Sequence, residues 1–185
     1  IFNDPIDPWL NTQYISGDEQ GNIIIGSENA VNNLELINQN LDISARNGAV
    51  INLSGIDSLN SNGGNLTLSA FEGYDNFNMI PIVSEISLGG DLNLGIGTLD
   101  LNAGYYDDPM LMFEYGGLLN LNGVSSITAG YVDVSAYGNN SFIDLSGVEN
   151  FTIGDPNGFI DPIDPWLYTQ YISGDEQGNI IIGSE

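Results

Sequence analysis

Oxygen-rich turns are the parts of this chain best suited to chemistry, and that chemistry would be the binding of a hard cation. Residues 155–164 read DPNGFIDPID, and residues 17–22 read GDEQGN. Carboxylate and carbonyl oxygens in such turns suit Ca²⁺. The first run departs from an EF-hand loop, because its spacing fails after Asn157 and no Glu closes it. The alternative is that Asp, Asn and Gly are simply turn formers. The residues predicted to bind Ca²⁺ are Asp155, Asn157, Asp161, Asp164, Asp18 and Glu19.

A second source of carboxylates is a recurring pattern of the form apolar-x-apolar-polar-Ala. It occurs as LDISA, LTLSA, LDLNA and VDVSA, with Asp42, Thr67, Asp100 and Asp133 in the middle. If these segments stack as neighbouring strands, like charges lie close together. Such carboxylates are unfavourable unless they are protonated or bridged by a cation, which also favours Ca²⁺.

Catalysis has few residues to draw on. The chain has no His, no Cys and no Lys, which excludes most pairs of nucleophile and base. Two carboxylates can still cleave a glycosidic bond, and the candidates are Asp107 and Asp108 beside Tyr105 and Tyr106. An acidic loop tip explains the same residues, so we do not expect an enzyme.

Aromatic residues gather in two stretches that contain proline, 71–84 and 155–177. Because proline is rare in central strands, we expect both stretches to be loops or edge flaps. Their aromatic side chains either grip sugars or another fibre, or pin the loops onto the fold. The residues concerned are Trp9, Trp166, Tyr14, Tyr171, Tyr74 and Phe77.

One stretch of the chain occurs twice. Residues 4–28 and 161–185 differ only at Asn11 and Tyr168, and Asp161 lies 157 residues after Asp4. Such near-identity indicates tandem duplication, so we expect a window of about one repeat from a longer array. The expected organisation is a duplicated segment at 1–28 (matching 158–185), rungs at 29–154 with an excursion at 71–84, a Pro/Trp-rich acidic excursion at 155–178, and the next repeat's rungs from 179–185.

The charge is strongly one-sided. The chain has 25 acidic residues against one basic residue, Arg46, for a net charge of −24. Repulsion therefore disfavours nucleic acid phosphates and anionic lipid as partners. With 42% apolar residues the chain can bury a core, yet it has no apolar run near the roughly 18 residues of a membrane helix. We expect neither nucleic acid binding nor membrane insertion.

Short alternating apolar runs dominate, and helical patterns are nearly absent, which indicates strands. A motif of apolar-x-apolar, a Gly-containing turn, then apolar-x-x-apolar recurs five times in one 157-residue repeat. Its last apolar residues are Leu34, Leu59, Leu99, Ile127 and Phe151. Within the motif, Asn52, Asn93, Asn120 and Asp144 share one place and predict a ladder of side-chain hydrogen bonds.

Rungs that cannot bury their own apolar edges bury them by stacking. The sequence therefore predicts an all-β fold, a β-solenoid with about five rungs per 157-residue repeat. The alternative is a string of β-sandwich domains, one per repeat. The predicted core residues are Ile23, Ile25, Ile51, Leu53, Leu92, Leu94, Leu119, Leu121, Ile143 and Leu145.

Two segments carry a family resemblance. GGNLTLSA at 63–70 and IDLSGVENFTIG at 143–154 resemble the repeats of filamentous-haemagglutinin-like bacterial surface proteins, and the likeness extends over most of 22–154. The resemblance implies a right-handed parallel β-helix, secretion, and a role as an adhesin or surface fibre. The variable rung length departs from that family, and the Pro/Trp-rich excursion has no counterpart in it.

These features together favour a structural protein. We expect an acidic, cation-stabilised extracellular fibre on a bacterial surface, whose partners are further copies of itself. The first alternative is an adhesin that binds surface glycans through the aromatic stretches. The second is a β-helix enzyme that acts on polysaccharides.

Overall fold

A computed structural model shows an all-β protein. It describes residues 12–17, 22–24, 33–36, 39–61, 63–71, 73–75, 80–104, 116–138, 141–154, 171–174 and 179–182. No helix occurs in these ranges. Within the same ranges there is accordingly no helical segment with the length and hydropathy to cross a membrane.

The first sheet has six strands, all paired in parallel. Their spatial order β1-β4-β7-β11-β13-β16 is also their order along the chain. Buried and half-buried residues alternate along β4 and β11, because successive side chains of a strand point to opposite faces. The strands are β1 (Thr12–Gly17), β4 (Asn40–Arg46), β7 (Leu66–Phe71), β11 (Thr98–Ala103), β13 (Tyr131–Ala136) and β16 (Tyr171–Gly174).

The second sheet has nine strands, and its pairs are parallel as well. Its main path runs β2-β5-β10-β12-β14-β17. The short strands lie off this path: β6 pairs with β10, β3 pairs with β6, and β15 pairs with β12. The strands are β2 (Asn22–Ile24), β3 (Asn33–Glu35), β5 (Val50–Leu53), β6 (Ser58–Asn60), β10 (Glu85–Asn93), β12 (Leu118–Ala129), β14 (Phe142–Leu145), β15 (Asn150–Ile153) and β17 (Asn179–Ile182).

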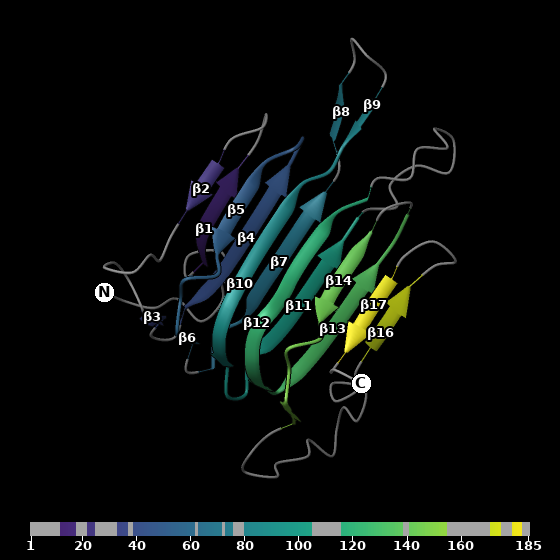
Figure 1. Cartoon of the computed structure of the whole chain (residues 1–185). Coiled ribbons are helices and arrows are strands. Elements are labelled where there is room, and N and C mark those ends of the chain that lie inside the picture. The colour runs from purple at the N-terminus through teal and green to yellow at the C-terminus, as the bar shows by residue number, and fades with distance from the viewer. Residues whose placement is uncertain are drawn as a thin grey trace.

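The two sheets face each other, and the chain alternates between them as it advances from one edge to the other (Figure 1). The arrowheads of the first sheet point opposite to those of the second. Apolar side chains from the facing sides form one continuous core. Burial of this apolar surface is the main favourable term in folding. Predicted core residues that are buried are Ile51, Leu53, Leu92, Leu94, Leu119, Leu121, Ile143 and Leu145.

This architecture corrects the expected fold. The sequence analysis predicts a β-solenoid, a right-handed parallel β-helix with about five rungs per repeat, whereas the described strands are organised as two large parallel sheets. The apolar residues of the apolar-x-apolar runs lie on the face of each sheet that packs against the other sheet. The repeated pattern therefore reflects two sheets packed face to face. The sheets also differ from those of β-sandwich domains, which are antiparallel.

The alignment of one predicted rung is also wrong. The sequence analysis aligned Leu99 with Leu59 and Ile127, but the residue paired with both is Leu92 in β10. Leu99 belongs to β11 of the first sheet, where it pairs with Leu66. Leu92 is preceded in β10 by seven residues, Glu85 to Asp91, which lie outside the recurring motif.

The second sheet loses its regular register where β10 meets β12. The pairing shifts once between Ser87 and Gly89 and again between Gly90 and Asp91. Gly90 has a φ of +75°, and a Cβ atom there would lie 2.3 Å from backbone atoms of Asp57. Glycine is the residue that tolerates both conditions. Such β-bulges bend a strand, in keeping with the curvature of β10 and β12 in Figure 1.

A small antiparallel ribbon stands apart from both sheets. It pairs β8 (Gly73–Asp75) with β9 (Ile80–Ile82) and projects from the end of the sheets (Figure 1). The ribbon lies within the excursion predicted at 71–84, and Pro81 belongs to β9 rather than to a central strand. Phe71, the first residue of that stretch, belongs to β7 of the first sheet.

Candidate functional site

The predicted metal ligands lie outside the described residues. This holds for Asp155, Asn157, Asp161, Asp164, Asp18 and Glu19, and also for the catalytic candidates Asp107 and Asp108. Among the residues that the structure does describe, no group of three or more acidic side chains is placed to hold a metal ion. The polar groups that the structure does describe lie on the outer faces and at the ends of the sheets.

The outer face of the first sheet carries the most regular arrangement of polar groups. Asp42, Thr67, Asp100 and Asp133 pair with one another on successive strands, and we call them the acidic column. Their shared place in the recurring pattern is therefore also a shared register in the sheet. Neighbouring strands are about 4.8 Å apart, so Asp100 and Asp133 are adjacent like charges.

The second column on this face supports the first. Asn102 donates from Nδ2 to Oδ1 of Asp100 at 2.8 Å, and Ser135 donates from Oγ to Oδ1 of Asp133 at 3.0 Å. Each donor lies two residues after its acceptor and therefore on the same face of the strand. These bonds hold the carboxylates in place without any basic partner.

Burial and crowding alter the protonation of the acidic column. Burial raises the pKa of Asp100; the bond from Asn102 lowers it, and the nearby charges of Asp133 and Asp42 raise it further. Burial also raises the pKa of Asp42, while the positive charge of Arg46 opposes this effect. Asp100 and Asp42 therefore bind a proton more readily than free aspartate does.

Arg46 stands at the end of this face. Its guanidinium carbon lies 5.3 Å from the centre of the Phe71 ring, and the two residues pair across β4 and β7. This distance is within the range of a cation–π contact. The one basic residue of the chain is thus held by an aromatic ring as well as by the field of Asp42.

The outer face of the second sheet carries a different column. Asn52, Ser87, Asn120 and Asp144 pair in succession, so Ser87 occupies the place that the sequence analysis gave to Asn93. Asn93 instead pairs with Asn60 and with Thr128 further along the sheet.

These side chains bond locally and do not form the predicted ladder. The Oδ1 atoms of Asn52, Asn120 and Asp144 accept from the backbone N–H two residues later, at 3.0, 3.3 and 2.9 Å. Asn93 accepts from Gly95 in the same way at 3.3 Å. Such bonds are typical of Asn and Asp at turns, so these residues shape the ends of strands.

A ladder between strands does exist, at residues that the sequence analysis did not select. Asn40 Oδ1 accepts from the backbone N–H of Asn65 at 2.9 Å, and Asn65 Oδ1 accepts from that of Thr98 at 2.9 Å. Each of these residues immediately precedes a copy of the apolar-x-apolar-polar-Ala pattern. That shared position is the signal by which the ladder can be found.

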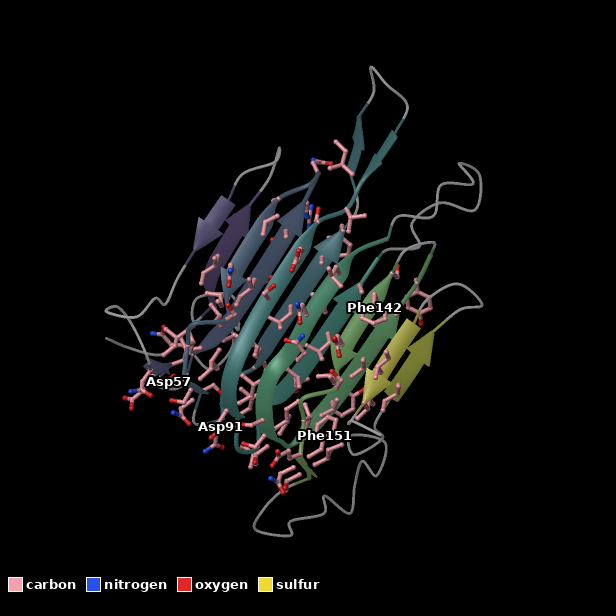
Figure 2. The ribbon with its side chains drawn as sticks, in the orientation of Figure 1. Asp57, Asp91, Phe142 and Phe151 are labelled. Carbon is pink, nitrogen blue, oxygen red and sulfur yellow. The ribbon has the colours of Figure 1, made fainter. Side chains whose placement is uncertain are left out.

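Asp91 provides the clearest contrast to the acidic column. It lies beside Asp57 at the bent end of the second sheet (Figure 2) and is exposed. Hydrogen bonds from the Ser125 and Ser126 hydroxyls, at 2.5 and 2.8 Å, lower its pKa. This carboxylate is therefore stabilised in its charged form.

The duplicated stretch lies at the edges of the sheets. β1 and β16 are the first and last strands of the first sheet, and β2 and β17 are those of the second. The sequences of β16 and β17 repeat those of 14–17 and 22–25. The sequence analysis assigned 171–174 to an excursion, but these residues form β16, which pairs with β13.

The predicted aromatic residues are only partly within the described ranges. Tyr14, Tyr171 and Tyr74 belong to β1, β16 and β8, whereas Trp9, Trp166 and Phe77 lie outside the described residues.

No protein family, curated protein or solved structure matches this chain.

Proposed function

We propose that this chain is part of a structural fibre protein at the outer surface of a bacterium. The observation that supports this most is the position of the duplicated stretch at both edges of both sheets. A parallel sheet grows by adding strands at its edge. A repeat whose first and last strands are the same can therefore be continued by the next repeat without a special junction.

The charge fits an extended structure that remains dispersed. A net charge of −24 causes strong repulsion between neighbouring rods at low ionic strength. Cations, with Ca²⁺ as the proposed ion, would reduce this repulsion along the acidic faces. The proposal assigns no catalytic step to the chain, and its partners are further repeats of itself.

Electron microscopy tests the proposal. A chain of four or more tandem repeats is imaged with and without a calcium chelator, and immunogold labelling locates the protein on the source cells. We expect thin rods that grow by about 24 Å per repeat, since five strand spacings of about 4.8 Å separate equivalent strands. Label confined to the cell interior, or compact particles of fixed size, would contradict the proposal.

A second candidate function is that of an adhesin, and the ribbon of β8 and β9 favours it. This ribbon projects from the sheets (Figure 1) and includes Tyr74, and aromatic rings stack readily on other rings and apolar faces. A glycan array compares the chain with its Tyr74→Ala and Trp166→Ala variants. Glycan binding that either variant abolishes supports the adhesin, and the absence of any binding argues against it.

A further inference from the structure

The last strands of the two sheets form an open edge, which we call the C-terminal edge. It consists of β16 (Tyr171–Gly174) and β17 (Asn179–Ile182), each paired on one side only among the described strands. A parallel edge strand leaves N–H and C=O groups available for a further strand. The question is what covers this edge.

Core-facing side chains at this edge are left exposed. Ile172 pairs with the buried Val134 but is 55% exposed, and Ile182 pairs with the buried Leu145 but is 43% exposed. Ile43, which pairs with Ile15 one strand inside the opposite edge, is 0% exposed. At this edge, side chains on the core-facing side of both sheets are therefore exposed to solvent.

The opposite edge shows what sequence fits next to it. Residues 14–17 and 22–24, in β1 and β2, are identical to those of β16 and the first part of β17. There, β4 covers β1, with Ile15 opposite Ile43, and β5 covers β2, with Ile23 opposite Ile51. The same strands can cover β16 and β17 in the same register.

The duplicated strands of both sheets have the same spacing along the chain. The offset between β1 and β16 and that between β2 and β17 are the same 157 residues, as Tyr14 and Tyr171 or Asn22 and Asn179 show. One second copy of the repeat would therefore satisfy both sheets together. The connection also exists already, because the path from β17 to a second β4 would have the sequence that joins β2 to β4.

We propose that a second copy of residues 29–185, following on the same polypeptide, continues both sheets across the C-terminal edge. Its Asn40–Arg46 segment pairs with β16, with Ile43 opposite Ile172, and its Val50–Leu53 segment pairs with β17, with Ile51 opposite Ile180. This inference rests on the proposed fibre function for the presence of a following repeat. It adds the register of the junction and the burial of Ile172 there.

The test compares the 185-residue chain with a two-repeat chain, residues 1–185 followed directly by 29–185. We expect one cooperative urea transition for the two-repeat chain, with an m-value close to twice that of the single chain. Its longest dimension in small-angle scattering should increase by about 24 Å, or five strand spacings. Two separate transitions and an increase of more than about 40 Å would overturn the proposal.

Ile172→Lys provides a matched pair of variants. In the single chain this side chain is exposed at the edge, so the urea midpoint should not move measurably. In the two-repeat chain the same substitution places a charge in the junction, so the single transition should split in two. An unchanged single transition in the two-repeat variant would show that Ile172 is not buried at a junction.

A failed junction and a failed fibre function give different results. If the single chain forms head-to-tail oligomers in sedimentation while the two repeats unfold separately, the edge is covered by separate molecules, and the same-polypeptide junction is wrong. If the two repeats unfold together but immunogold labelling shows an intracellular protein, the junction stands and the surface role fails.

Discussion

The first and second sheets are built from equally apolar strands, yet only the first keeps one register throughout. In the first sheet, Leu41, Leu66, Leu99 and Val132 pair in succession without a bulge. In the second, β12 contains two more residues than β10 over the same span, as the two register shifts show. Both sheets nevertheless bury their inner faces almost completely.

The difference shows where this fold allows changes in length. The second sheet bends between β5 and β6, where four residues, 54–57, connect the two strands. In β10 the corner is made within the strand at Gly89 and Gly90. Length differences between strands of the second sheet are thus accommodated at this corner, while the first sheet keeps one register.

The strongest test of this comparison removes one core side chain from each sheet. Leu101 and Leu92 are 0% and 1% exposed. If both sheets are equally well packed, Leu101→Ala and Leu92→Ala should each lower the free energy of unfolding by about 2–5 kcal/mol. Urea denaturation followed by circular dichroism measures the change.

Ile96→Ala is the control for these two variants, because Ile96 is 62% exposed. It should change the free energy of unfolding by less than about 0.5 kcal/mol. A loss at Leu92 less than half of that at Leu101 would mean that the bulged sheet is more loosely packed. The two sheets would then differ in packing as well as in register.

The next test acts on the bulge itself. Gly90→Ala introduces a Cβ atom 2.3 Å from the backbone of Asp57, at a φ of +75°. We expect a loss of about 2–3 kcal/mol in the free energy of unfolding from strain of this kind. Gly123→Ala is the matched control in the neighbouring strand β12, because a Cβ atom there would lie 3.3 Å from Gly89 Cα. Equal losses in the two variants would show that the bulge does not depend on the conformation of Gly90.

The sequence predicted the strand pairing of the first sheet well because the same five-residue pattern recurs in its strands. The pattern around Asp42, Thr67, Asp100 and Asp133 aligns without gaps, and the structure pairs these residues as expected. The strand class and the core residues follow from alternation in the same way. The fifth copy, QYISG at 170–174, departs from the pattern because Gln170 replaces the first apolar residue and Gly174 replaces Ala.

The second sheet was predicted less well, because its pattern depends on tertiary contacts. Asn93 matches Asn52 and Asn120 in type and in its turn bond, but the bulge moves it to another column. Nothing in the local sequence separates Leu92 from Leu99 as the partner of Leu59. The arrangement of strands as two large sheets likewise depends on long-range pairing.

A smaller effect should follow from breaking the ladder of the first sheet. Asn65→Ala removes the oxygen that accepts from Thr98 N–H and leaves the ladder from Asn40 interrupted. We expect a loss of about 1 kcal/mol in the free energy of unfolding. Asn65→Asp keeps an acceptor and should lose less. If both variants lose the same amount, the Asn65 side chain has another role.

The smallest expected effect distinguishes the sheets by the sign of their pH dependence. Burial raises the pKa of Asp100 above its ordinary value of 3.8, so the folded chain keeps this proton at a pH where the unfolded chain has lost it. As the pH rises from 3.8 through the folded-state pKa, this residue therefore lowers the free energy of unfolding. Asp100→Asn removes a like charge opposite Asp133 and should gain a few tenths of a kcal/mol in the free energy of unfolding at pH 7, with the gain vanishing near pH 3.

Bonds from Ser125 and Ser126 lower the pKa of Asp91. Its contribution to the free energy of unfolding is therefore present above pH 3.8 and is lost on acidification. Asp91→Asn should therefore destabilise at pH 7 and have little effect at pH 3. Urea midpoints of both variants at pH 3, 5 and 7 measure this opposition, and shifts of the same sign would show that burial does not separate the two carboxylates.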